Sequence, residues 1–497
     1  MIASVRGARE WIKQGAWRPL FFDKGWLNMT WPSLVSRKAS NERPEPVYTQ
    51  LSPSGLRLPL DTVTADKPSQ SLIIQCGRRQ IVVPRSRGQR ELALGSEHLR
   101  ELACPRIRLQ LQRQTSGLRI GPVFGVYALQ FPGNKPFGPQ TALFRDVAML
   151  CRRYGALCVI LTPGSLDPAS MSVNGYRMTE AGVWRRERLP WPDYVWRRVT
   201  VRPPEMESIL QDDERCCAAL SMNGTLLRAQ SEKWRLYQEL QQDPALPPHL
   251  PRTRLIGAAD DIRAVLESYR DMYVKPTRGT QGQRIVRIRH DGTTVYQQPV
   301  RGKSVRLGAD DRAVAALRRY WAARLHRHAG RYIAQETVDV MRLKTGHPFD
   351  VRFLIQAVAD AKPVCTATVI KVGDGEAITT NLHTGGQAYL PEALEPYLRK
   401  RDLTLFREGL QAGANLAQTA FVTLAKRRPE LVEIGADVAV DRKGRPWLLE
   451  VNPCPGRRML RDVDSGLRHL SLVRVVEYAV FCTGFSCSQP ARKGEDI

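Results

Sequence analysis

The stretch EIGADVAVDRKGRPWLLEVNPCPG, residues 433–456, decides the fold of this chain. Two apolar runs rich in β-branched residues, Ala436–Val440 and Pro446–Val451, flank the polar residues 441–444, which end in glycine. Apolar runs separated by a short turn of this composition are typical of a β-hairpin. The stretch is therefore predicted to form two antiparallel strands.

Acidic and amide side chains are expected to converge on this hairpin. Pairing across the turn puts Asp437 within a residue or two of Leu448, and Glu450 and Asn452 share a face because side chains at i and i+2 of a strand do so. An all-oxygen set suits Mg²⁺, which uses one or two carboxylates while phosphates fill other positions. An exposed hairpin with polar residues on its wet face is the alternative. Glu450 ends an apolar run that prolines then stop, which favours a site.

The composition describes a basic globular protein. The chain has 497 residues, of which 42% are hydrophobic and 25% charged, and two to four domains are expected at this length. Its net charge of +26 favours polyanionic partners in general, including nucleotide phosphates, acidic proteins and nucleic acid. No helix-turn-helix, zinc-finger or RNP-like signature accompanies the charge, so nucleic acid is an unlikely partner.

The cysteines and the N-terminal residues indicate a reduced, cytoplasmic setting. The ten cysteines show no CxxC pair and no Cys/His spacing of a zinc site. The first thirty residues lack the apolar core of a signal peptide, and no run approaches the length of a membrane-spanning helix. Secretion and membrane insertion are both disfavoured.

The chain divides into five predicted segments by composition and pattern. They are a basic, poorly ordered leader (1–45), a small β-rich domain (46–120), an α/β domain (121–230), a domain containing the hairpin (231–481) and a C-terminal tail (482–497).

The α/β domain is predicted to contain a βαβ unit. Residues 121–127 and 157–161 read as buried strands, and residues 141–154 between them have helical apolar spacing. A further strand is expected at 193–196. No GxGxxG opens the helix, so a dinucleotide fingerprint is excluded.

A glycine-bearing hairpin is predicted next, after helices at 232–240 and 262–269. The strand 272–275 ends in Lys275, residues 276–283 form the loop, and a strand resumes at 284–288. Backbone N–H groups of such a loop can approach phosphates, and a lysine at its base would neutralise them. The spacing is not that of a Walker A motif, and for this loop alone a plain hairpin is favoured.

One antiparallel sheet is expected to contain the opening hairpin and the strands 332–338, 350–358 and 367–371, crossed by a helix at 403–424. A polar turn at 380–386 could face a ligand. His383 in this turn lacks a second histidine at metal spacing and is interpreted as a packed or capping residue. A last helix at 467–480 should pack on the core.

These pieces, in this order, resemble the ATP-grasp superfamily. The set comprises a strand ending in lysine, a glycine-rich hairpin, a QE strand, a D-x-R strand, the NLHTGG turn and a D…E-x-N hairpin. The NLHTGG turn and LLEVNPCPG look most like the glutamate-ligase branch. Over residues 47–480, GPVFGVYA, VNGYRM and EKWRLYQEL look like the YheC/YheD family of endospore coat-associated proteins.

The resemblance implies an α/β (α+β) ATP-grasp fold whose two subdomains clasp the nucleotide, preceded by a βαβ pre-ATP-grasp layer and a small β-rich N-terminal domain. It also implies roles for matching positions. Nucleotide contacts fall on Lys233, Lys275, Gly279, Thr280, Gln281, Gly282, Gln335, Glu336 and Val338. Catalytic positions near the γ-phosphate are Arg352, Lys371 and Asn381, and the metal ligands are Asp437, Glu450 and Asn452.

The implied activity is that of an ATP-dependent carboxylate-amine ligase acting through an acylphosphate, with ATP and Mg²⁺, or alternatively Mn²⁺, as cofactors. The acid and the amine are open, and a protein or peptide is one candidate. Spore coat proteins are candidate partners, and a spore coat association accompanies the cytoplasmic setting. A coat structural or assembly protein that retains the nucleotide site is the chief alternative, and a nucleic-acid-binding protein is the third.

Overall fold

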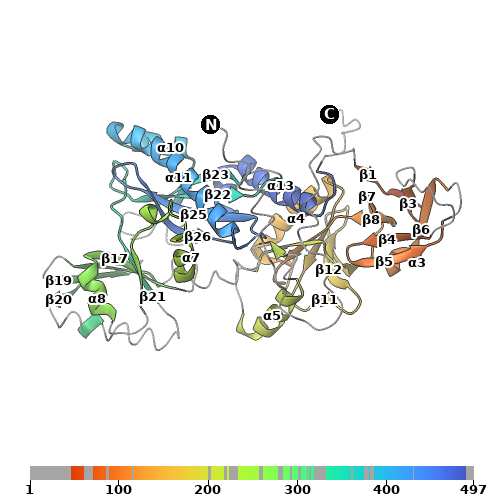
Figure 1. Cartoon of the computed structure of the whole chain (residues 1–497), viewed down its shortest axis with the longest axis horizontal. Helices are drawn as coiled ribbons and strands as arrows, with labels where there is room; N and C mark the ends of the chain where they lie inside the picture. Colours follow the sequence, from red (N-terminus) through yellow and green to blue (C-terminus); the bar gives the residue numbers. More distant parts are fainter. Residues whose placement is uncertain are drawn as a thin grey trace. The chain divides into compact units, whose positions relative to one another are not determined.

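The computed structural model describes residues 46–60, 71–85, 89–114, 117–199, 203–217, 221–222, 233–256, 261–277, 284–290, 294–299, 304–309, 312, 315–317, 319, 332–359, 362–373, 380, 386–428 and 430–487. Its internal contacts divide the chain into two compact units (Figure 1). The first contains residues 1–222, 358–361 and 472–497, and the second contains residues 223–357 and 362–471.

The first unit is built on three sheets. The five-stranded sheet has the order β1 (Val47–Tyr48), β7 (Gln110–Gln114), β8 (Gly117–Gly121), β4 (Leu72–Cys76), β5 (Arg79–Val83). The three-stranded sheet has the order β2 (Gln50–Ser52), β3 (Gly55–Pro59), β6 (Glu91–Gly95). The seven-stranded sheet has the order β11 (Leu166–Asp167), β12 (Ser172–Met178), β10 (Leu157–Leu161), β9 (Val123–Tyr127), β14 (Tyr194–Arg197), β15 (Ser221–Met222), with β13 (Trp184–Pro190) paired to β12. Its helices are α3 (Ser96–Glu101), α4 (Thr141–Arg153) and α5 (Glu207–Cys216), with 3₁₀ turns η1 (Gly138–Gln140) and η2 (Pro204–Met206).

The predicted βαβ unit is confirmed. β9 and β10 are parallel neighbours, and α4 connects them along the chain and packs on β10. Every residue of β9 and of β10 is buried, as expected for strands covered on both faces. β14 continues the parallel layer on the other side of β9.

One hydrophobic core runs through the first unit. Its buried side chains extend from Leu56 to Cys217 and include residues on both sides of position 120, where a domain boundary is predicted. The boundary itself stays a prediction.

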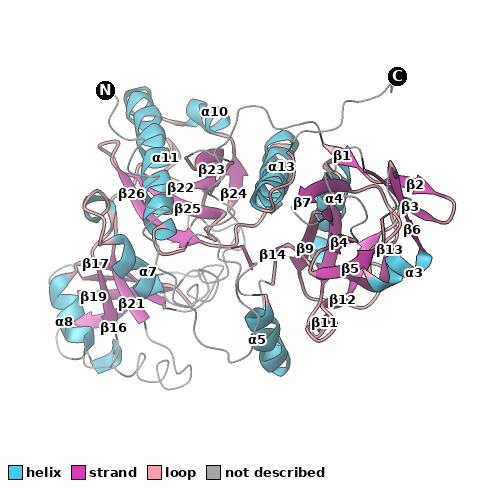
Figure 2. Ribbon diagram, turned by 45° about the vertical axis from the view of Figure 1, so that its right-hand side comes forward, coloured by secondary structure: helices cyan, strands magenta, loops and turns pink. Residues whose placement is uncertain are grey.

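The second unit contains two sheets (Figure 2). The six-stranded sheet has the order β16 (Thr253–Ile256), β21 (Tyr332–Glu336), β17 (Asp271–Pro276), β18 (Val286–His290), β19 (Thr294–Pro299), β20 (Val305–Ala309). The five-stranded sheet has the order β24 (Gln387–Tyr389), β23 (Val364–Val372), β22 (Phe349–Gln356), β25 (Glu433–Val440), β26 (Pro446–Asn452). The helices are α7 (Lys233–Leu240), α8 (Asp261–Ser268), α10 (Pro391–Leu394), α11 (Leu403–Ala425), α12 (Arg458–Val463) and α13 (Ser465–Cys482), with 3₁₀ turns η3 (Pro247–His249), η5 (Glu395–Tyr397) and η6 (Lys400–Asp402). The division into units assigns α13 from Leu472 onward to the first unit.

The sheet assignment of the strand at 332–338 was wrong. β21 pairs with β16 and β17 in the six-stranded sheet, not with the strands of the acidic hairpin. Strand character is a local property, whereas the partner of a strand depends on contacts distant in sequence. The rest of that predicted sheet is confirmed, because β22 pairs with both β23 and β25, and β25 pairs with β26.

The hairpin of the opening stretch forms as predicted. The turn closes with Gly444, whose φ of +80° suits glycine, and the side chain of Asp441 accepts hydrogen bonds from the amides of Lys443 and Arg445.

The long helix α11 lies against one face of the five-stranded sheet (Figure 1). Gly409 makes this approach close, since a Cβ there would lie 2.6 Å from Val440 Cγ1. Phe353 and Val438 also approach the helix, at Gly413. Their strand neighbours Arg352 and Asp437 must therefore point to the opposite face of the sheet.

Candidate functional site

A row of charged residues crosses three adjacent strands on the face away from α11. Arg352 on β22 is opposite Asp437 on β25, and Asp437 is opposite Glu450 on β26. A register shift after Asp437 produces this alignment and leaves Val438 opposite Leu448. Asn452 lies two residues beyond Glu450, opposite Gly435. The hairpin thus places both predicted carboxylates side by side, as its sequence indicates.

Four buried charges form the inner part of this row, and we call Asp350, Arg352, Lys371 and Asp437 the four-charge cluster. Arg352 donates from Nε and from a terminal nitrogen to the two oxygens of Asp437, the latter at 2.7 Å. The Lys371 ammonium lies 2.8 Å from Asp350 Oδ1 and 3.1 Å from Asp437 Oδ1. Two cations and two carboxylates are therefore matched within the cluster.

Burial and pairing compete in this cluster. Burial opposes ionisation of Asp437, but Arg352 and Lys371 outweigh it and hold the pKa of that carboxyl well below its usual range. Burial likewise disfavours the charged form of Lys371, yet Asp350 and Asp437 raise its pKa. For Asp350 burial prevails and raises the pKa of the carboxyl, although Lys371 opposes the shift.

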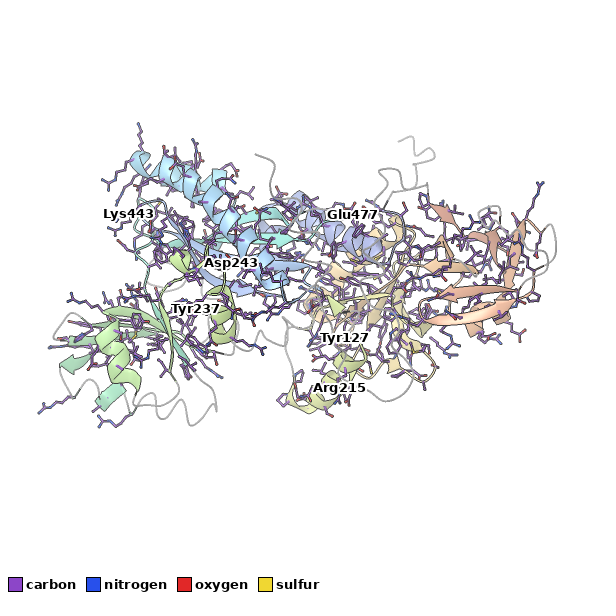
Figure 3. The ribbon with its side chains drawn as sticks, in the orientation of Figure 1. Tyr127, Arg215, Tyr237, Asp243, Lys443 and Glu477 are labelled. Carbon is purple, nitrogen blue, oxygen red and sulfur yellow. The ribbon has the colours of Figure 1, made fainter. Side chains whose placement is uncertain are left out.

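A pocket of mixed character lies beside the cluster, and we call it the lysine pocket. Its empty volume of about 530 Å³ includes space open to solvent. Its lining residues come from both sheets of the second unit, from α7 and from the end of η3, namely Lys233, Leu236, Tyr237, Leu240, Leu250, Thr253, Lys275, Ile333, Gln335, Leu448, Leu449, Glu450 and Val451. Figure 3 labels Tyr237 on α7, in the region between the two sheets. Most of the lining is apolar, and two lysines and Glu450 supply its charge.

The two lysines of the pocket are placed on different elements. Lys275, at the end of β17, donates to Gln335 Oε1 on the neighbouring strand β21 at 2.6 Å. Lys233, at the start of α7, lies 3.4 Å from Glu450 Oε1. Burial lowers the pKa of Lys275 to about 8, although the nearby Glu450 opposes the shift. A nearby anion would raise the pKa of this ammonium again.

Helix α7 is anchored to the end of α11, which fixes the position of Lys233. Glu239 on α7 forms a buried ion pair with Arg428 at 2.7 Å. Asp243, just after α7, accepts hydrogen bonds from Thr423 at 2.8 Å and Lys426 at 3.1 Å (Figure 3). Both anchors join segments about 180 residues apart in sequence.

The predicted metal ligands fit a cation that is shared with a ligand's phosphates. Asp437, Glu450 and Asn452 offer only oxygen atoms, which suits Mg²⁺. The amide oxygen of Asn452 already accepts a hydrogen bond from the Cys454 amide at 3.0 Å, so this oxygen would have to be shared with the ion. In the described part of the chain no three His, Cys, Asp or Glu side chains gather as a metal site. A cation here would rest on two carboxylates and an amide oxygen, and ligand oxygens would complete its shell.

Two of the predicted nucleotide contacts lie away from the pocket. The side chain of Glu336 pairs with Arg252 at 2.6 Å in an exposed position, and neither Glu336 nor Val338 lines the pocket. Only a backbone contact from this segment is consistent with that placement. Gly279, Thr280, Gln281, Gly282, Asn381 and His383 lie outside the described residues.

Asp350 was given no role in the sequence-based prediction, although it is the first residue of the D-x-R strand. The i, i+2 spacing to Arg352 was the signal that could have placed Asp350 on the same face.

A buried network at the end of the hairpin was not predicted from the sequence. Arg457 donates to Glu433 and to Ser471 Oγ, and Gln356 donates to Glu433 at 3.0 Å and to the Ser471 carbonyl at 2.9 Å. The network holds the segment after Asn452 against α13. Its residues lie far apart in the sequence, so no local pattern could reveal it.

Residues 227–482 match the sequence model of a family described as YheC/D like ATP-grasp. The chain belongs to this family. Membership confirms the predicted ATP-grasp fold, and the matched residues contain the lysine pocket and the four-charge cluster.

Two curated proteins of Bacillus subtilis (strain 168) are similar to this YheC/D-like chain. The endospore coat-associated protein YheD is 25% identical over 410 residues, which cover 80% of this chain and 88% of YheD. The endospore coat-associated protein YheC is 19% identical over 321 residues, which cover 64% of this chain and 86% of YheC.

Solved structures with detectable similarity include D-cycloserine synthetase DcsG, with 16% identity, a TM-score of 0.42 and coverage of 72% of this chain and 99% of DcsG. The ATP-grasp ligase PsnB, in complex with a minimal precursor, Mg and ADP, has 14% identity, a TM-score of 0.40 and coverage of 73% of this chain and 97% of PsnB.

Among the described residues, no helix is long and apolar enough to span a membrane.

Proposed function

We propose that this chain binds ATP with Mg²⁺ in the lysine pocket and uses it to activate a carboxylate. The main support is that one pocket has an apolar lining together with lysines and a carboxylate, and that the four-charge cluster with its further carboxylates lies beside it. A nucleotide complements such a pocket, because its flat base suits the apolar lining and its polyanionic phosphate tail suits the lysines.

The base would lie against the apolar lining, which includes Leu236, Leu250 and Ile333. The phosphates would lie toward Lys233 and Lys275, whose ammonium groups neutralise negative charge. The glycine-bearing residues 279–282, with Thr280 and Gln281, would cover the phosphates. This assignment follows family membership and the position of Lys275 immediately before that loop.

Asp437, Glu450 and Asn452 would hold Mg²⁺, or Mn²⁺ as the alternative, against the phosphate oxygens. The ion supplies charge neutralisation during phosphoryl transfer. To reach the ion, Asp437 must share its oxygens, because Arg352 and Lys371 already bind it. Arg352, Lys371 and Asn381 would stabilise the transferred phosphoryl group.

The reaction we propose is the ligation of a carboxylate to an amine. The γ-phosphoryl group passes to a carboxylate oxygen and ADP leaves; the amine then attacks the acylphosphate carbon and phosphate leaves. Small carboxylates and peptide carboxylates are both candidate substrates.

Calorimetry with ATP and Mg²⁺ tests the nucleotide site. Lys275→Ala should weaken binding about 10- to 100-fold, since a hydrogen bond to a charged group contributes about 1.5–3 kcal/mol. Glu450→Gln should weaken binding in the presence of Mg²⁺. Lys443→Ala, an exposed lysine at the hairpin turn, and Glu408→Gln, an exposed acid on α11, are the matched controls and should bind as wild type does. Unchanged affinity in both site variants would show that the assignment is wrong.

The ligase reaction is tested by ADP release. A panel of carboxylic acids and amines, including peptides, is added to the full chain with ATP and Mg²⁺. Release that requires both an acid and an amine, and that Glu450→Gln abolishes, supports a ligase. Failure across a broad panel, with ATP binding intact, favours the structural alternative.

A second candidate function is a role in the spore coat, which the names of the relatives YheD and YheC favour. A fluorescently tagged copy of this chain, expressed in sporulating Bacillus subtilis, should form a rim around the forespore. The Glu450→Gln copy separates the two functions, because a structural protein should still form the rim. Diffuse fluorescence from both copies contradicts the coat role.

A further inference from the structure

Asp350 lies beside the proposed catalytic residues, but neither the family match nor the residue assignments give it a role. It is buried on β22, directly opposite Lys371 on β23. It precedes Arg352 by two positions, so both side chains share the face that carries the site.

The contacts of Lys371 show what Asp350 does to its neighbour. The Lys371 side chain is only 4% exposed, and its ammonium lies 2.8 Å from Asp350 Oδ1 and 3.1 Å from Asp437 Oδ1. The hydroxyl of Thr380 donates to the other oxygen of Asp350. Asp350 is thus held from one side while it attracts Lys371 from the other.

We infer that Asp350 is a positioning residue that divides the Lys371 ammonium between two carboxylates and so leaves Asp437 able to share its charge with a Mg²⁺–phosphate group. The inference rests on the proposed function. Asp437 already accepts two hydrogen bonds from Arg352. A second cation bound only to Asp437 would compete with the metal for the same oxygens.

The physical basis is the strength of charge interactions in a buried site. Attraction between charges rises as the local dielectric constant falls, so a buried ammonium that loses one carboxylate moves onto the other. Replacing Asp350 by asparagine keeps the shape of the side chain and removes its charge. Lys371 would then pair fully with Asp437, and binding of the metal would have to displace it.

The test is a Mg²⁺ titration of ATP binding to the full chain at fixed ATP concentration, followed by calorimetry. Asp350→Asn should raise the Mg²⁺ concentration at half-saturation about tenfold. In the Lys371→Met background the same substitution should change it by less than about twofold, because no ammonium remains to be redistributed. Asp271→Asn is the matched control. Its carboxylate pairs with Arg287 in the other sheet, and its Mg²⁺ requirement should equal that of wild type.

A purely structural role for Asp350 predicts a different result. Asp350→Asn would then lower the thermal unfolding midpoint without changing the Mg²⁺ requirement, or would shift that requirement equally in both backgrounds; either result overturns the inference. If Asp350→Asn alone does not fold, the charge-neutral double variant Asp350→Asn/Lys371→Met is compared with wild type. A Mg²⁺ requirement at or below that of wild type supports the inference, and a higher one overturns it.

The two proposals fail in distinguishable ways. If wild type does not bind ATP with Mg²⁺, or if Lys275→Ala binds it as well as wild type, the proposed function fails and this inference falls with it. If wild type binds ATP in a Lys275-dependent way and Asp350→Asn leaves the Mg²⁺ titration unchanged, only the role of Asp350 is wrong.

Discussion

The lysine pocket and the four-charge cluster lie side by side in the second unit but differ in how their charged groups are paired. In the cluster, each cation contacts at least one carboxylate, and the Lys371 and Asp437 side chains are 4% and 9% exposed. In the pocket, the Lys275 ammonium donates to a neutral amide, and Glu450 is 40% exposed and 3.4 Å from Lys233. The charges of the cluster are matched internally, whereas the Lys275 ammonium of the pocket is paired with an uncharged group.

This difference predicts that substitutions in the cluster cost stability in addition to any effect on the ligand, whereas substitutions in the pocket act mainly on binding. Substitutions in the cluster should alter stability because they leave a buried charge without compensation. Substitutions in the pocket should alter binding with little effect on stability, because solvent screens a partly exposed pair. The two regions can therefore be distinguished by measuring stability and affinity on the same variants.

The largest stability effect is expected from Asp437→Asn. Loss of this carboxylate leaves Arg352 and Lys371 with Asp350 alone, and breaking a buried pair in this way costs about 3–5 kcal/mol. Chemical denaturation of the full chain measures the change. Glu450→Gln should cost less than about 1 kcal/mol, and Asp339→Asn, in an exposed pair with Arg442, serves as the control. Equal costs for Asp437→Asn and Glu450→Gln would remove the distinction between the two regions.

A slightly smaller effect is expected from Arg428→Met, which removes the buried partner of Glu239 and leaves it only the exposed Arg235 at 3.5 Å among the described residues. The loss should cost about 3 kcal/mol and should also weaken ATP binding, because α7 carries Lys233 into the pocket. Denaturation and calorimetry on the same variant measure both effects. Arg407 lies on α11 and forms an exposed pair with Glu395. Arg407→Met breaks this pair and should change neither stability nor ATP affinity. Wild-type affinity in a destabilised Arg428→Met variant would show that α7 does not need this anchor to position Lys233.

The pH dependence of ATP binding tests the pocket by itself. Lys275 has a pKa of about 8 in the protein without ligand, and phosphate raises the pKa of a neighbouring ammonium, so binding takes up a proton above that pH. Affinity should therefore fall about tenfold between pH 7 and pH 9. Calorimetry at constant Mg²⁺ measures the change.

Lys275→Arg is the control for this pH series, because its guanidinium stays charged throughout, and its affinity should be nearly constant. The charged groups that act on Lys275 are Lys233, Glu450, Asp437 and Asp350. A wild-type affinity that is flat from pH 7 to pH 9 contradicts the assignment of Lys275.

The smallest effect is expected from Gln335→Leu. The substitution removes the acceptor that orients the Lys275 ammonium, and one hydrogen bond contributes about 1 kcal/mol, or about a fivefold loss of ATP affinity. Gln411→Leu, at an exposed position on α11, is the control. A loss as large as that of Lys275→Ala would mean that Gln335 contacts the nucleotide directly.

Much of the fold could be predicted from local patterns. The βαβ unit, the acidic hairpin and the long helix α11 were each predicted within a few residues, because apolar periodicity and turn residues are encoded locally. Sheet membership could not be predicted in the same way, and β21 was placed in the wrong sheet. Its sequence identifies a buried strand but does not specify β16 and β17 as partners.

The same contrast between local pattern and distant partners applies to the residues of the candidate site. That Asp437, Glu450 and Asn452 lie close together could be predicted from the sequence, because one hairpin carries all three and its turn fixes which residues face each other. Asp350, Arg428 and the Arg457–Glu433 network were not found, since each acts through a partner distant in the sequence.

Local sequence is sufficient to specify the hairpin that carries the acidic residues, because strand alternation and turn chemistry are short-range. Long-range packing is what brings Arg352 and Lys371 to Asp437 and makes Glu450 face the lysine pocket. The physical reason is that ion pairing and burial depend on which strands and helices pack around a residue, and β22, β23 and α7 reach this hairpin from distant parts of the chain.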